Sequence, residues 1–87
     1  MELKAGMLAI SKAGHDKDCW YVVSKVEGNE VFLINGVNRT IDAPKKKKRK
    51  HLQPVCEIPE TLNEKLQAGK PWTNEEIKRA LKLAQRD

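Results

Sequence analysis

Short apolar runs separated by turn residues dominate the first 56 residues, and this spacing predicts short β-strands. Strands are expected over residues 7–12, 19–26 and 30–34, with a short closing strand over 52–55. In the strand over 19–26, alternation places Trp20, Val22, Ser24 and Val26 on one face and Cys19, Tyr21, Val23 and Lys25 on the other.

The dipeptide Asn35-Gly36 is the strongest hairpin signal, because both central residues of a type I′ turn need positive φ. It predicts a turn into a fourth strand over 37–42, in which Val37, Arg39 and Ile41 alternate with polar residues until Pro44 ends it. Five short strands at this spacing predict a small, strongly bent barrel, since closure removes exposed edges.

Residues 57–87 change to a helical pattern, so the chain divides into a barrel over 1–56 and a C-terminal helical extension over 57–87. Leu62 and Leu66 stand four apart before Gly69, which is placed to stop a helix. Thr73-Asn74-Glu75-Glu76 is a capping box, and it precedes an apolar stripe formed by Ile77, Ala80, Leu81 and Ala84. One or two short helices are therefore expected to pack on the barrel or on a partner, with Trp72 as an anchor.

Charge is concentrated in one segment. The chain has a formal net charge of +5, and the six consecutive basic residues 45–50 exceed that value alone. Such a run creates a local field that a polyanion can feel, and phosphate backbones are its commonest target. A plain solvated loop and a nuclear-localisation address remain open as alternatives.

Composition indicates a small globule without a membrane partner, a cofactor or an active site. No apolar stretch approaches the roughly 20 residues that cross a bilayer, and no signal peptide is evident, so a cytoplasmic or nuclear location is expected. In isolation the protein is expected to be a monomer. His15, Cys19, His51 and Cys56 could supply zinc ligands, but the tight Cys-x-x-Cys spacing of structural sites is absent, and no metal is expected. No nucleophile with a base and an orienting group is apparent, so we predict that the protein is not an enzyme.

Residues 6–18, Gly-Met-Leu-Ala-Ile-Ser-Lys-Ala-Gly-His-Asp-Lys-Asp, followed by an aliphatic strand, resemble the KOW motif. The longer pattern continues through Asn35-Gly36, Arg39 and the basic run to His51-Leu52. It is similar to the family of large-subunit ribosomal protein fourteen-e and to short bacterial KOW-domain RNA-binding proteins. The resemblance covers roughly residues 5–56. One departure is Asp18, where KOW loops usually have Gly.

The resemblance implies a mainly β fold, a five-stranded SH3-like barrel of KOW type, and an RNA-binding surface. The residues expected to contact RNA are Lys12, Gly14, His15, Lys17, Arg39, Lys45, Lys46, Lys47, Lys48, Arg49, Lys50 and His51. The expected partner is large-subunit ribosomal RNA, with neighbouring ribosomal proteins, in a ribosomal or ribosome-associated protein that reads shape and backbone. Trp20 and Trp72 are assigned to packing rather than base stacking. The alternative function is a protein-interaction module of the transcription or translation machinery that uses the C-terminal helix.

Overall fold

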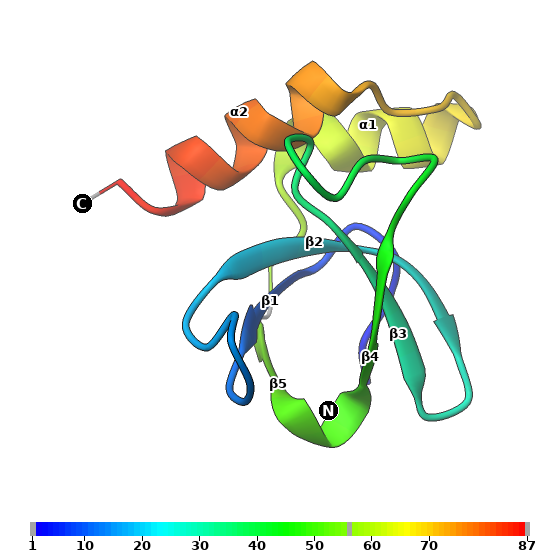
Figure 1. Cartoon of the computed structure of the whole chain (residues 1–87). Helices are drawn as coiled ribbons and strands as arrows, with labels where there is room; N and C mark the ends of the chain where they lie inside the picture. Colours follow the sequence, from blue (N-terminus) through cyan, green and yellow to red (C-terminus); the bar gives the residue numbers. More distant parts are fainter. Residues whose placement is uncertain (1, 56, 87) are drawn as a thin grey trace.

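Five antiparallel strands form one sheet in the computed structural model, which describes residues 2–55 and 57–86. The strands are β1 (Leu8–Ser11), β2 (Trp20–Glu27), β3 (Glu30–Ile34), β4 (Lys45–Lys48) and β5 (Leu52–Val55). Their spatial order is β4-β3-β2-β1-β5, and a 3₁₀ turn, η1 (Arg49–His51), links the two edge strands (Figure 1). No pairing joins β4 to β5 within the described chain. The prediction of a mainly β fold with five strands is thus confirmed, whereas the predicted closure into a barrel is not seen: the sheet is curled and open between β4 and β5 in the described chain.

The face assignment for β2 is correct only up to its middle. Trp20 and Val22 face one side of the sheet and Tyr21 and Val23 the other, as alternation predicts. The register then shifts between Val23 and Lys25, which indicates a β-bulge. A bulge reverses the alternation beyond it, so Val26 packs with Tyr21 and Val23 rather than with Val22.

The fourth strand predicted over residues 37–42 is wrong, and so is the two-residue turn before it. Residues 35–44 form an irregular connection, and the strand that pairs with β3 is the lysine run itself. Gly36 has a φ of +79°, but Asn35 is not in the positive-φ region, which rules out type I′. Instead the Asn35 side-chain oxygen accepts hydrogen bonds from the amides of Val37 (2.9 Å) and Arg39 (3.0 Å).

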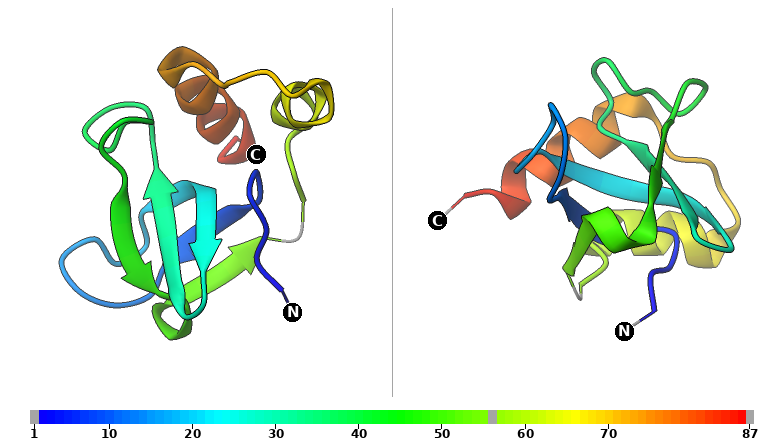
Figure 2. Two further views of the ribbon diagram at one scale, coloured as in Figure 1. Left: turned by 90° about the vertical axis from the view of Figure 1, so that its right-hand side faces the viewer. Right: turned by 60° about the horizontal axis from the view of Figure 1, so that its bottom comes forward.

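Both predicted helices are present, as α1 (Glu60–Ala68) and α2 (Asn74–Ala84), and they lie on one side of the sheet (Figure 2). Gly69 ends α1 in the left-handed conformation, and the capping box between Thr73 and Glu76 begins α2. The stripe on α2 is confirmed for its buried members Ile77, Ala80 and Leu81, whereas Ala84 is exposed. Neither described helix has the length and apolar character to cross a membrane.

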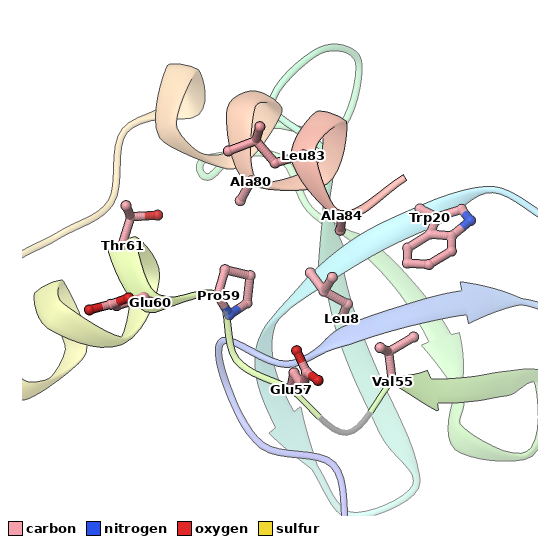
Figure 3. Close-up of a pocket in the computed structure, with 10 residues that line it drawn as sticks. All are labelled: Leu8, Trp20, Val55, Glu57, Pro59, Glu60, Thr61, Ala80, Leu83 and Ala84. Atoms are coloured by element: carbon pink, nitrogen blue, oxygen red, sulfur yellow. The ribbon is translucent and has the colours of Figure 1, made fainter. Parts of the chain in front are cut away.

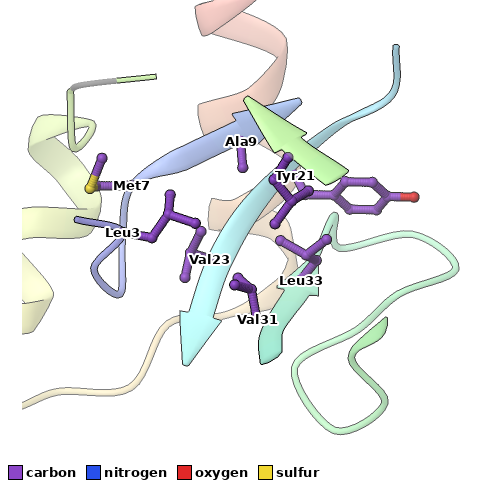
Figure 4. Close-up of a cluster of buried hydrophobic side chains, with 8 residues drawn as sticks. Leu3, Met7, Ala9, Tyr21, Val23, Val31 and Leu33 are labelled. Carbon is purple, nitrogen blue, oxygen red and sulfur yellow. The ribbon is translucent and has the colours of Figure 1, made fainter. Parts of the chain in front are cut away.

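Two apolar clusters hold the sheet from its two sides. The inner cluster, on the concave side, contains Leu3, Met7, Ala9, Tyr21, Val23, Val31, Leu33 and Leu52 (Figure 4). The outer cluster joins the sheet to the helices and contains Leu8, Val22, Ile34, Leu62, Ile77, Ala80 and Leu81. Trp72 packs against the outer cluster and donates from its indole nitrogen to the Leu62 carbonyl at 2.9 Å, which confirms it as an anchor. The buried residues of the α2 stripe therefore pack within the outer cluster.

Candidate nucleic-acid interface

The basic run forms a strand, and this sorts its side chains onto two faces. Lys45 and Lys47 pair with Leu33 and Val31, so they project to the side of the inner cluster. Lys46 and Lys48 lie on the opposite side and are exposed. All four lysines were predicted to contact RNA, but Lys45 and Lys47 are only 26% and 12% exposed.

Asp16, in the β1–β2 loop, binds both inward lysines. Its carboxylate accepts from Lys45 Nζ at 2.9 Å and from Lys47 Nζ at 3.0 Å, and the Asp16 side chain is only 11% exposed. The Ser11 hydroxyl and the Tyr21 hydroxyl donate to it as well, each at 2.9 Å. Lys47 also donates to the Ala13 carbonyl at 2.9 Å. Four side chains thus converge on one carboxylate and fasten the loop to β4.

The electrostatics of this cluster follow from its partial burial. Burial alone would raise the pKa of the Asp16 carboxyl, but hydrogen bonds from Lys45, Lys47, Ser11 and Tyr21 outweigh it and hold that pKa far below its usual range. Burial raises the pKa of the Tyr21 hydroxyl, and the hydrogen bond to ionised Asp16 raises it further. The Asp16 carboxylate is therefore ionised at neutral pH, and its negative charge compensates part of the positive charge of the basic run.

The loop that resembles the KOW motif has a defined backbone. The Asp18 amide donates to the Ser11 carbonyl (2.7 Å) and the Cys19 amide to the Asp16 carbonyl (2.9 Å). Gly14 has a φ of +84° and Asp18 a φ of +73°; Asp18 is the only non-glycine with positive φ in the described chain. Aspartate tolerates this conformation better than most residues, so Asp18 can occupy this turn.

The predicted loop residues are accessible but not all unpaired. Lys12, His15 and Lys17 are exposed, and Lys12 lies 3.6 Å from the exposed carboxylate of Asp18. The Lys12 amide donates to the His51 carbonyl at 2.8 Å, which sets the start of the loop beside η1. The structure thus brings the β1–β2 loop, β4 and η1 onto one end of the molecule.

Arg39 does not lie on a strand beside the basic run, as the sequence suggested. It is half-buried in the irregular connection, and its charge acts on Tyr21, where it opposes the rise in pKa. Its carbonyl accepts from the Asn35 amide at 2.7 Å, so its backbone helps to close this connection.

Three consecutive basic residues of β4 and η1 line a hollow beside the β2–β3 turn. Lys48, Arg49, Lys50 and Asn29 line this space of about 360 Å³, and no carboxylate is among its lining residues. The Arg49 amide donates to the Asn29 carbonyl at 2.8 Å and fixes η1 against the turn. No ion pair involves Lys48, Arg49 or Lys50 in the described part of the chain. We call this group the outward cluster.

Lys46 extends the outward cluster along β4. Its ammonium lies 5.6 Å from the centre of the Phe32 ring, with Lys25 at 5.5 Å from the same ring, and its contact with Glu30 is long, at 3.9 Å. Exposed pairs of this kind contribute little and leave the cation accessible. Lys25 and Asn29 were not predicted. The strand period places Lys25 on the face of Tyr21 and Val23, and only the β-bulge between Val23 and Lys25 brings it beside Phe32 on the other face. Asn29 depends on contacts far apart in the sequence.

The zinc alternative finds no support in the described residues, where no group of three or more His, Cys, Asp or Glu side chains is arranged around a common point. Cys19 is exposed rather than a partly buried apolar residue, and Cys56 lies outside the described residues. No family model matches the chain, and no curated protein matches it significantly.

Proposed function

We propose that this protein is a non-catalytic RNA-binding protein of SH3-like, KOW type, acting as a ribosomal or ribosome-associated protein on large-subunit RNA. The outward cluster carries this proposal, because its three cations line one hollow and make no ion pair within the described chain. Such an arrangement suits phosphate oxygens and offers no base-reading code.

The sheet order and the positive-φ position support the KOW-type assignment. A 3₁₀ turn between the last two strands and a β1–β2 loop held over one end of a curled sheet are compatible with an SH3-like fold. Asp18 adopts a backbone conformation that glycine adopts most readily, at the position where the motif has glycine.

The rival proposal, a protein-interaction module that uses the C-terminal helix, is less favoured by the geometry. The apolar stripe that would form the contact is buried against the outer cluster. A partner of α2 would have to use its exposed residues, half of which are basic: Glu75, Lys78, Arg79, Lys82, Leu83 and Ala84.

Salt dependence of RNA affinity tests the proposal. If the four outward cations Lys46, Lys48, Arg49 and Lys50 each neutralise one phosphate, affinity for a structured RNA should fall roughly 10²-fold between 50 and 200 mM salt, by analogy with duplex DNA. Six engaged cations would give about 10³-fold. The measurement is fluorescence anisotropy with a labelled ribosomal RNA hairpin.

Two variants locate the contact. Lys48→Gln with Lys50→Gln should weaken binding and make the salt slope shallower by about 2. Lys70→Gln, which removes a charge from the α1–α2 connection, serves as the control and should leave the slope unchanged. A salt-independent affinity, or equal losses in both variants, would reject the outward cluster as an RNA site.

A further inference from the structure

The two tryptophans differ in how their indole nitrogens are satisfied. The Trp72 nitrogen donates to a backbone carbonyl, as buried indoles usually do. The Trp20 indole nitrogen has no hydrogen-bond acceptor among the described residues. It is also accessible: among the described residues, Arg49 Nε is the one side-chain nitrogen or oxygen that is fully buried without a hydrogen bond. Trp20 is half-buried, and Figure 3 shows its nitrogen turned away from Leu8. Trp20 therefore has a donor available to something outside the chain.

Trp20 lines an open groove between the sheet, the β3–β4 connection and α2. This groove has a volume of about 380 Å³, and its other lining residues are Asn35, Val37, Lys78, Leu81, Lys82 and Gln85. Val37 is 69% exposed. The groove thus combines an aromatic wall with an exposed aliphatic side chain.

The charge of the groove is positive. No acidic residue lines it, and Lys82 makes no ion pair within the described chain. Lys78 contacts Glu75 at 3.2 Å, but both side chains are well exposed, at 45% and 84%, so this pair is weak. An aromatic wall beside accessible cations is the combination that binds single-stranded nucleic acid, because a base stacks on the ring and its phosphate meets the cation.

We propose that this groove binds one unpaired nucleotide of RNA, with the base against Trp20 and the phosphate near Lys78 and Lys82. The inference rests on the proposed RNA-binding function and adds to it a preference for a single-stranded segment beside structured RNA. The groove lies at the α2 end of the molecule and the outward cluster at the η1 end (Figure 1), so the two sites can be altered separately.

Fluorine NMR of the full chain labelled with 5-fluorotryptophan tests the site, since Trp72 is a built-in control. We expect a ten-residue oligoadenylate to shift the Trp20 resonance and to leave the Trp72 resonance in place. An abasic oligomer with the same number of phosphates should move neither. Resonances are assigned with Trp20→Phe and Trp72→Phe.

The outcomes separate this inference from the proposed function. Binding of oligoadenylate, seen by anisotropy, with an unmoved Trp20 resonance overturns the groove and leaves the outward cluster intact. Failure of the oligomer and of the structured hairpin to bind overturns the proposed function itself. A Trp20 shift caused by polyglutamate but not by RNA would show a groove for acidic peptides and also overturn the inference.

Affinity gives a second, independent measurement. Trp20→Leu should weaken oligoadenylate binding roughly 5- to 100-fold, the range for loss of one stacked base, with the loss confined to the base-bearing oligomer. Lys82→Gln should weaken both oligomers, and Lys70→Gln neither. If circular dichroism shows that Trp20→Leu is unfolded, the fluorine result on the unaltered chain decides alone.

Discussion

Lys45 and Lys47 differ from Lys46 and Lys48 only in what surrounds an identical side chain. The side chains of Lys45 and Lys47 are 26% and 12% exposed and bind a carboxylate that is itself largely buried. The Lys46 side chain is 55% exposed, and in the described chain its one ion pair is a long contact of 3.9 Å with Glu30. The two pairs alternate along one strand of four residues.

This difference shows that the positive charge counted along a basic run is larger than the positive charge that the run exposes to solvent. The strand period divides the run into a structural half, which fastens the β1–β2 loop to the sheet, and a half that is free to meet phosphate. A partly buried lysine that is already paired with a carboxylate neutralises little phosphate charge, so few of the counterions condensed on RNA are released when it binds. The positive potential at the protein surface is therefore weaker than the sequence suggests.

The strongest test of this division removes the shared acceptor. Asp16→Asn should lower the free energy of unfolding by about 3 kcal/mol, because the ammonium groups of Lys45 and Lys47 would lose their partner while partly buried. Asp18→Asn is the matched control; its pair with Lys12 is exposed and should contribute less than about 1 kcal/mol. Urea unfolding measures both. Equal losses would mean that the inward lysines are no more structural than surface ones.

The second test concerns the connection that sets the register of β4. A Cβ at Gly36 would lie 2.4 Å from the Asn74 carbonyl oxygen, and φ there is +79°. Gly36→Ala should therefore destabilise the protein by roughly 2–3 kcal/mol through strain and a backbone clash with α2. Gly28→Ala has a similar φ of +60° and no neighbour within 4 Å, so it should lose only about 1 kcal/mol. Similar losses in urea unfolding would show that contact with α2 does not hold the connection.

The third test replaces each of the two pairs of lysines by glutamine in a separate variant. Lys45→Gln with Lys47→Gln should lower the free energy of unfolding by about 2 kcal/mol, since Asp16 would keep only its hydroxyl donors. Lys46→Gln with Lys48→Gln should change stability by less than about 0.5 kcal/mol and make the salt slope of RNA binding shallower by about 2. Urea unfolding and anisotropy are measured on both variants. The division fails if both pairs behave alike in either measurement.

Local signals in the sequence predicted the helices well, because their determinants lie within a few residues of one another. Gly69 ends α1 and the Thr73–Glu76 box begins α2, each through hydrogen bonds inside one turn. The strands β1, β2, β3 and β5 followed from apolar runs for the same reason. The bulge in β2 has no local signal that would have located it.

The fourth strand could not be predicted because what makes it a strand lies elsewhere in the chain. Four identical lysines show no alternation, so the period that distinguishes a strand is invisible in them. Their backbone pairs with β3, where Lys47 lies opposite Val31 and Lys45 opposite Leu33. Asp16, about thirty residues earlier in the chain, compensates the positive charges of Lys45 and Lys47. Asn35-Gly36 misled for a similar reason, since Gly36 is required by its contact with α2 as well as by its own backbone.

The smallest predicted effect is a pH dependence that belongs to Asp16 alone. Its pKa is lowered in the folded state from a usual value of 3.8, so the stability it contributes is fully present above that value and is lost as pH falls below it. Between pH 5 and pH 3 the unfolded chain takes up a proton at this residue while the folded chain does not, which should remove about 1 kcal/mol. Because other carboxyls titrate in the same range, the quantity to measure is the difference in unfolding free energy between the wild type and Asp16→Asn at each pH. That difference in unfolding free energy should be about 1 kcal/mol smaller at pH 3 than at pH 5. A difference that stays constant would show that Lys45 and Lys47 do not stabilise the ionised carboxylate, and the division of the basic run into two halves would lose its electrostatic basis.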